Sequence, residues 1–167
     1  MATLQLEVVT PQGIVLDEAV DEVVAPSVNG EFGVLPGHLP LLAALQVGML
    51  RFTKDGKSTD VAVGRGFAEV IDDKAIILTD RFCIKDDIEV LKVRERLETV
   101  DAKLDAWDKE LNDPERHELI EEEQWLATQL ELYGDPPPPR LLEMPARNFA
   151  GIMPDANQER PDDDDDA

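Results

Sequence analysis

The feature that most constrains this fold is a change of hydrophobic period at Asp86. From Leu4 to Ile84, short β-branched segments alternate apolar and polar residues, which is typical of strands. After Asp86 the apolar residues recur at steps of three and four, and this heptad pattern predicts a helix. The positions in the pattern are Val90, Val93, Leu97, Val100, Leu104, Trp107 and Leu111. The chain should therefore fold as a β domain followed by helices.

Residues 1–84 are predicted to form an antiparallel β-sandwich or barrel. The strand segments are evenly spaced and no helix lies between them, which argues against a parallel α/β sheet. Asn29-Gly30 and Asp55-Gly56 are expected to be hairpin turns, because type I′ turns need positive φ at both central residues.

Residues 85–133 are predicted to form an antiparallel two-helix hairpin. Asp86 and Glu89 have the spacing of a capping box at the start of the first helix. The sequence NDP at 112–114 should end that helix and begin the second, which is expected to stop at Gly134. Because a two-helix hairpin buries little apolar surface by itself, it should dock on the β domain or on a partner. The expected apolar face of the second helix is Leu119, Leu126, Leu130 and Tyr133.

Residues 134–167 are predicted to be a disordered acidic tail. The segment begins with a run of prolines, which favours extended polyproline conformation, and it carries five consecutive aspartates that repel one another. The stretch 140–153, RLLEMPARNFAGIM, is less polar than an ordinary linker and is a candidate docking segment.

Composition excludes several classes of function. A formal net charge of −21 argues against binding nucleic acid or an anionic membrane surface. No apolar run is long enough to span a bilayer, and the N-terminus lacks the pattern of a signal peptide. Cys83 is the only cysteine, so we expect a structural thiol rather than a disulfide or a metal site.

No combination of residues suggests catalysis. There is no phosphate-binding loop, and VGRGF at 63–67 is expected to be a tight turn or bulge between strands. Ser27 and Ser58 do not lie in a nucleophile elbow. His38 could act as a general base, or it could hold a backbone carbonyl within a Pro-Gly turn. With no second catalytic group identifiable, we expect neither an enzyme nor a cofactor.

The segment GEFGVLPGHLPLL at 30–42 is too broken by Gly and Pro for a helix and too apolar for an ordinary surface loop. Together with the β domain and the hairpin, it resembles the epsilon subunit of F-type ATP synthases, called delta in mitochondria. The resemblance covers about residues 1–133. The family pattern GxxGxxPGHxPLL is matched at Gly30, Gly33, Pro36, Gly37, His38, Pro40, Leu41 and Leu42.

This resemblance implies a non-catalytic rotor subunit in the central stalk, which couples ion-driven rotation of the c-ring to ATP synthesis. Its partners would be the gamma subunit, the c-ring loops and the alpha/beta catalytic hexamer. It would lie at the cytoplasmic face of the bacterial inner membrane without inserting into it. The implied rotor interface is Glu31, Phe32, Gly33, Val34, Leu35, Pro36, Gly37, His38 and Pro40.

Apolar side chains of this interface are expected to be exposed in the chain alone. Because exposed apolar side chains are unfavourable in water, a partner should cover them. Phe32, Val34 and Leu35 are the candidates. The alternative is that they cap the core of the sandwich. A different class of function, a free-standing β-sandwich that binds a ligand or peptide, also fits the pattern, and a small hydrolase using His38 is a third reading.

The chain departs from the family at a motif through which some members bind ATP, [IL]DxxRA. Ile88, Glu89, Lys92 and Val93 occupy it here, and lysine lacks the planar fork with which arginine grips phosphate. The second helix has only Arg116 where ATP-binding members use several arginines. We therefore expect no nucleotide binding. The acidic second helix should also oppose insertion of an extended hairpin between the catalytic subunits, a known inhibitory posture of the family.

Overall fold

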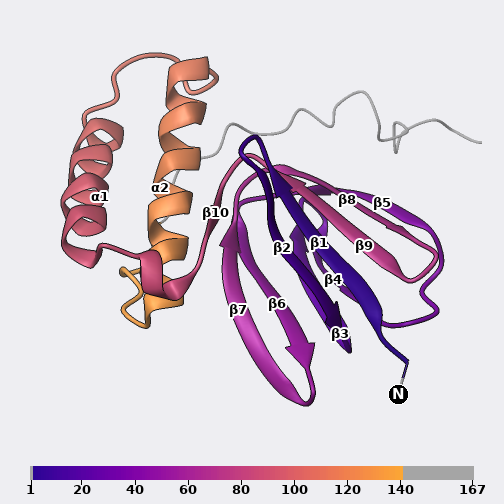
Figure 1. The fold of residues 1–167 in the computed structure, drawn as a ribbon. Helices are drawn as coiled ribbons and strands as arrows, with labels where there is room; N and C mark the ends of the chain where they lie inside the picture. The colour runs from indigo at the N-terminus through magenta and orange to yellow at the C-terminus, as the bar shows by residue number, and fades with distance from the viewer. Residues whose placement is uncertain (1, 141–167) are drawn as a thin grey trace, which may run out of the picture.

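The computed structural model describes residues 2–140, which form a β domain with a helical hairpin packed beside it (Figure 1). The predicted fold class is confirmed for this part of the chain, and residues 141–167 of the predicted tail lie outside it. The strands are β1 Leu4–Thr10, β2 Gly13–Val20, β3 Glu22–Ser27, β4 Gly30–Val34, β5 Leu41–Leu45, β6 Gly48–Lys54, β7 Lys57–Val63, β8 Gly66–Ile71, β9 Lys74–Thr79 and β10 Phe82–Cys83.

The strands form one sheet that curls around a single apolar core. Their order is β10-β7-β6-β3-β5-β8-β9-β1-β2, with β4 paired to β3 at the side. All pairs are antiparallel except β1 with β9, a parallel pair that the sequence pattern did not predict. Alternate residues of each strand point into the core, as in β1, where every second residue is buried. The largest fully buried side chains include Leu4, Leu6, Leu50 and Ile77.

The two predicted hairpin turns differ in outcome. Asp55 and Gly56 have φ values of 51° and 75° between the paired residues Lys54 and Lys57, as predicted for a type I′ turn. The other hairpin exists, but its turn is shifted by one residue, since Ser27 pairs with Gly30.

The shift at this second turn has a local cause. The hydroxyl of Ser27 donates to the carbonyl of Gly30 at 2.6 Å and accepts from the amide of Asn29 at 3.2 Å. These bonds close a turn over Val28 and Asn29. The prediction of Asn29-Gly30 as its central pair is therefore wrong, and Gly30, with φ 110°, begins β4 instead.

The segment VGRGF contains a two-residue connection, Gly64-Arg65, between strands that do not pair with each other. Close approach to the backbone at the end of β9 requires glycine at Gly66, and the side chain of Asp80 leaves little room at Gly64. A Cβ on Gly66 would lie 1.7 Å from the carbonyl oxygen of Leu78, and a Cβ on Gly64 would lie 2.0 Å from Oδ1 of Asp80. The connection thus carries the chain closely past β9 rather than turning it back as a hairpin.

The first helix, α1 Val90–Asp105, is shorter than predicted. It is preceded by a 3₁₀ turn, η1 Lys85–Asp87, and its N-cap Glu89 makes no side-chain cap bond, so the predicted capping box of Asp86 and Glu89 is wrong. Trp107 and Leu111 follow the helix instead of extending it. The indole of Trp107 donates to the carbonyl of Glu110 at 3.1 Å and so closes a turn in the loop before α2.

The second helix, α2 Pro114–Tyr133, has the predicted ends. Asp113 caps it by accepting from the amide of Glu115 at 2.9 Å, Pro114 occupies the first position, and Gly134 ends it with φ 105°. Its apolar face is only partly as predicted: Leu126 and Leu130 are buried, whereas Tyr133 is exposed. The helix contacts both α1 and the β domain, so its buried residues extend over a wider arc that includes Ile120 and Leu132.

The hairpin is docked on the β domain along β6 and β7 (Figure 1). Ala62 of β7 shares an apolar cluster with residues of both helices, with Trp125 packed against it. Two polar contacts add to this interface: Arg65 pairs with Glu121 at 2.7 Å, and the guanidinium of Arg81 lies 5.9 Å from the centroid of the Trp125 ring. None of the described helices is long and apolar enough to cross a bilayer.

Candidate functional site

The loop at residues 35–40, between β4 and β5, is held in a defined conformation. The amide of Gly37 donates to Oδ1 of Asp73 at 2.5 Å, which fastens the loop to the β8–β9 turn. Within the loop, the amide of His38 donates to the carbonyl of Leu35 at 3.1 Å. Pro36 and Pro40 further restrict its backbone. These contacts produce a stiff projection at the end of the β domain.

The predicted rotor interface is divided between this loop and the core. Phe32 and Val34 alternate with Glu31 and Gly33 along β4, so they point inward while the others point outward. Val34 is fully buried and Phe32 packs against the core, so the expectation that both are exposed is wrong. Leu35 is 55% exposed, and the loop residue that the prediction omitted, Leu39, is 79% exposed.

His38 lies half-buried in the 35–40 loop, with Nδ1 2.6 Å from the carbonyl oxygen of Leu39. The sequence left two roles open for His38: a general base, or a side chain that holds a backbone carbonyl within the turn. This contact matches the second role. Within residues 2–140, no group of three or more His, Cys, Asp or Glu side chains is placed to hold a metal ion.

A second surface was missed by the sequence reasoning: a line of apolar residues that crosses five neighbouring strands in register. We call it the apolar row. Phe67 and Leu78 are direct cross-strand partners, 56% and 49% exposed, and Ile14 at the far end is 60% exposed. The paired residues, in order across β5, β8, β9, β1 and β2, are Ala44, Phe67, Leu78, Val9 and Ile14.

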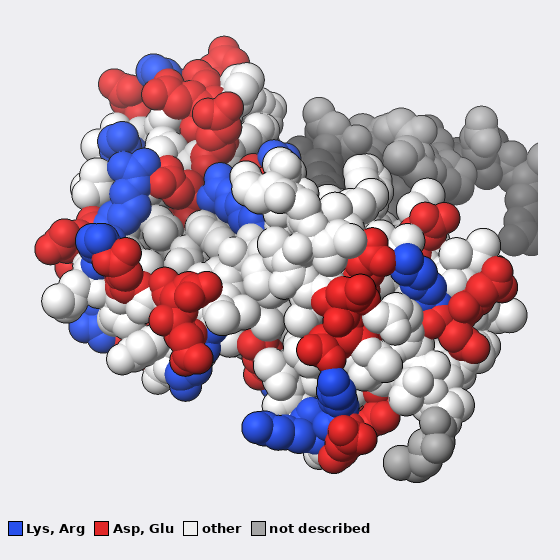
Figure 2. All heavy atoms as spheres, in the orientation of Figure 1, with Lys and Arg blue, Asp and Glu red and all other residues white. Residues whose placement is uncertain are grey.

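The apolar row lies on the outer face of the sheet, near the end from which the chain leaves for the hairpin. Figure 2 shows an uncharged area over the β1–β2 end of the row, whereas charged side chains gather on the hairpin and along the opposite rim. The signal in the sequence is that KAIILT, at 74–79, is apolar at positions of both parities. A strand with one solvated face should alternate, so a partner could have been expected there.

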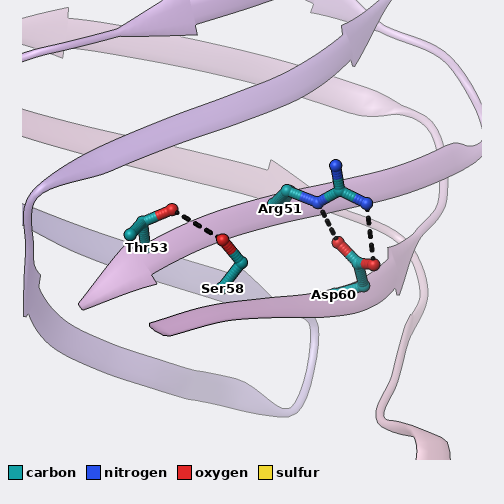
Figure 3. A network of polar contacts seen from close by, with 4 residues as sticks. All are labelled: Arg51, Thr53, Ser58 and Asp60. Atoms are coloured by element: carbon teal, nitrogen blue, oxygen red, sulfur yellow. Dashed lines mark hydrogen bonds and ion pairs between the residues drawn. The ribbon is translucent and has the colours of Figure 1, made fainter. Parts of the chain in front are cut away.

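The outer face of the other half of the sheet is different (Figure 3). On β6 and β7, Arg51 donates to both carboxylate oxygens of Asp60, at 2.7 and 3.0 Å, and the hydroxyls of Thr53 and Ser58 are 3.1 Å apart. These cross-strand pairs satisfy their own polar groups. The outer face of β6 and β7 therefore needs no partner to satisfy it, whereas the apolar row leaves apolar side chains in water. The apolar row is the candidate docking face.

The residues of the nucleotide motif do not form a phosphate site with Arg116. Ile88 is buried, and Lys92 forms an ion pair with Glu89. Because the helices are antiparallel, Arg116 lies at the other end of the hairpin, where it is buried and Nη1 donates to the carbonyl of Leu111 at 3.4 Å. The absence of nucleotide binding stays a prediction.

Cys83 is half-buried on β10, and its thiol donates to the carbonyl of Ile84 at 3.3 Å. Burial, and to a lesser degree the nearby Asp87 carboxylate, raises the pKa of the thiol. A raised pKa keeps the thiol protonated at neutral pH and therefore a poor nucleophile.

Comparison with known proteins identifies the family. Residues 3–85 match the family described as ATP synthase, Delta/Epsilon chain, beta-sandwich domain. The ATP synthase epsilon chain of Nitratidesulfovibrio vulgaris is 43% identical over 102 residues, which are 61% of this chain and 76% of the relative. That of Trichlorobacter lovleyi is 46% identical over 94 residues, 56% of this chain and 68% of the relative.

A solved structure agrees with the sequence comparisons. A chain in the cryo-EM structure of the Euglena gracilis mitochondrial ATP synthase, OSCP/F1/c-ring, superposes with a TM-score of 0.66 at 25% identity. The alignment covers 78% of the present chain and 81% of that one. From the matched domain, the relatives and this fold, we conclude that the chain belongs to the family of ATP synthase epsilon chains.

Proposed function

We propose that the chain is a non-catalytic subunit of the central stalk of an ATP synthase, where it couples rotation of the c-ring to ATP synthesis through the gamma subunit. The observation that carries this proposal is the apolar row. Solvent-facing Phe67, Leu78 and Ile14 form one line across a rigid sheet, and such a line is unfavourable in water unless a partner covers it.

We assign the apolar row to the gamma subunit. The row rests on five hydrogen-bonded strands, from β5 to β2, over a packed core. A partner bound to it would contact a surface that cannot bend independently of the domain. This is the mechanical property required of a part that must turn with its partner under load.

We assign the 35–40 loop to the polar loops of the c-ring. The loop is fastened to the β8–β9 turn, whereas the apolar row crosses β8 and β9 near their other ends. Two partners could therefore bind at the same time, one at each end of the domain. Leu35 and Leu39 would supply apolar contacts, and the turn at His38 would hold them in place.

We further propose that the docked hairpin is the resting posture and that inhibition by an extended hairpin is weak. Helix α2 carries six glutamates and one arginine, a net charge of −5. An extended hairpin would bring this charge close to the alpha/beta hexamer, whose facing loops are acidic in the family, and like charges there oppose binding. The site of action would be peripheral, at the cytoplasmic face of the bacterial inner membrane.

The test is co-purification of the tagged full chain with the gamma, alpha and beta subunits encoded by the same organism. We expect gamma to be retained in equal amount and the alpha/beta hexamer to be retained only when gamma is present. If the chain elutes alone while the other subunits assemble without it, the proposal is wrong and the chain is a free-standing binding module.

A further inference from the structure

The segment that follows α2, residues 135–140, lies back along α1, and we call it the strap. It consists of Asp135, four prolines and Arg140. Asp135 forms an ion pair with Arg94 near the start of α1. At the other end, Nη1 of Arg140 is 2.7 Å from Oδ1 of Asp101, and its other terminal nitrogen pairs with Asp105. These residues lay within the predicted disordered tail, but they have defined partners.

The strap has the length needed to reach both anchors. A polyproline segment rises about 3.1 Å per residue, so the five steps from Asp135 to Arg140 span roughly 15 Å. An α-helix rises about 1.5 Å per residue, so the path from Arg94 to the pair Asp101 and Asp105 is roughly 10 to 16 Å. Because prolines restrict the unfolded chain as well, ordering this segment costs less entropy than ordering a flexible one.

The Arg140 anchor neutralises a repulsive pair between the helices. Oδ1 of Asp101 is buried, and within residues 2–140 Arg140 is the only cation in ion-pair distance of this carboxylate. Glu123 of α2 lies within electrostatic range of Asp101. Burial of Glu123, and next the charge of Asp101, raises the pKa of its carboxyl, while Arg140 acts in the opposite direction. Without Arg140, the buried Oδ1 of Asp101 would have no cation of residues 2–140 in ion-pair distance.

We propose that residues 135–140 are an intramolecular strap that holds α1 against α2, with Arg140 as the contact that must be released before the two helices can separate. The inference goes beyond the proposed stalk function and concerns the isolated chain. Its failure therefore leaves the stalk assignment intact, and failure of the stalk assignment leaves the strap intact.

Hydrogen exchange of the full-length chain, followed by mass spectrometry, tests the strap. In Arg140→Gln we expect exchange of the α1 amides at 98–105 to be about three- to ten-fold faster, from the size of a partly buried ion pair. The matched control is Arg51→Gln, which also removes an arginine bound to an aspartate but lies on β6. It should leave exchange in α1 unchanged.

A rescue variant separates the strap from a general loss of stability. If Arg140 acts by neutralising Asp101, then Asp101→Asn combined with Arg140→Gln should exchange more slowly than Arg140→Gln alone, because the unpaired buried charge is gone. Exchange in Arg140→Gln at the wild-type rate would overturn the proposal. So would a double variant that exchanges faster than Arg140→Gln.

Discussion

Replacement of Phe67 by alanine should weaken binding to the gamma subunit without unfolding the β domain. Phe67 is the second of the five residues in the apolar row, on β8 between its paired neighbours Ala44 on β5 and Leu78 on β9. Its ring is more than half exposed in the chain alone. A partner that covers the row must therefore bury the exposed part of this ring.

The expected loss follows from the exposed area. Phe67 is 56% exposed, which for an aromatic side chain that buries about 200 Å² leaves about 110 Å² for a partner to cover. At about 25 cal/mol per Å², covering this area is worth about 2.8 kcal/mol, and about 0.8 kcal/mol remains with the alanine methyl. The difference of about 2 kcal/mol corresponds to an affinity about 30-fold weaker.

The folded domain should lose much less. The contact of Phe67 with Leu78 is a cross-strand pair on an outer face, and such pairs contribute about 0.2–1 kcal/mol. A thermal melt of Phe67→Ala should therefore still show one cooperative transition, slightly below that of the wild-type chain.

Calorimetric titration with the purified gamma subunit measures the affinity. The control is Leu91→Ala, which removes a side chain that is 75% exposed but lies on α1, away from the apolar row. Phe67→Ala should bind about 30-fold more weakly and Leu91→Ala like the wild type. Wild-type affinity in Phe67→Ala, with the melt as expected, would refute the assignment of the apolar row to the gamma subunit.

Three further predictions concern the loop, the hairpin and the nucleotide motif. Leu35→Asp combined with His38→Ala should reduce pelleting of the assembled stalk with c-ring vesicles while leaving the thermal melt of the chain close to wild type; unchanged pelleting would exclude the loop as the contact. Burial, and then Asp101, raises the pKa of Glu123, so its charged form destabilises the fold above the raised pKa. Glu123→Gln should thus raise the melting temperature at neutral pH, and the gain should disappear as pH falls towards the ordinary glutamate pKa; a gain that is independent of pH would point to another cause. Calorimetry of the isolated chain with millimolar ATP should show no binding, because Lys92 is paired with Glu89 and lacks the planar fork of arginine; a micromolar dissociation constant would contradict this.

Local patterns in the sequence were sufficient for the order and type of the elements. The change of period at Asp86 separated the β domain from the hairpin, because strand and helix periods depend only on neighbours along the chain. Pro114 and Gly134 marked the ends of α2 for the same reason: each acts through its own backbone angles. The loop motif at 30–42 was distinctive enough to indicate the family, which the comparisons confirm.

The binding surfaces were decided by contacts between distant residues. Strand alternation requires that Phe32 and Val34 share a face, but only the packing of β4 beside β3 placed that face in the core. The apolar row depends on the mutual register of five strands, and no single strand contains that information. In the sequence, Arg140 belongs to a segment predicted to be a disordered tail. Only the tertiary structure places Asp101 and Asp105 beside it. Sequence determined what each segment is because propensity is local, whereas tertiary structure decided what each surface can bind because register and charge pairing join residues that are far apart in the chain.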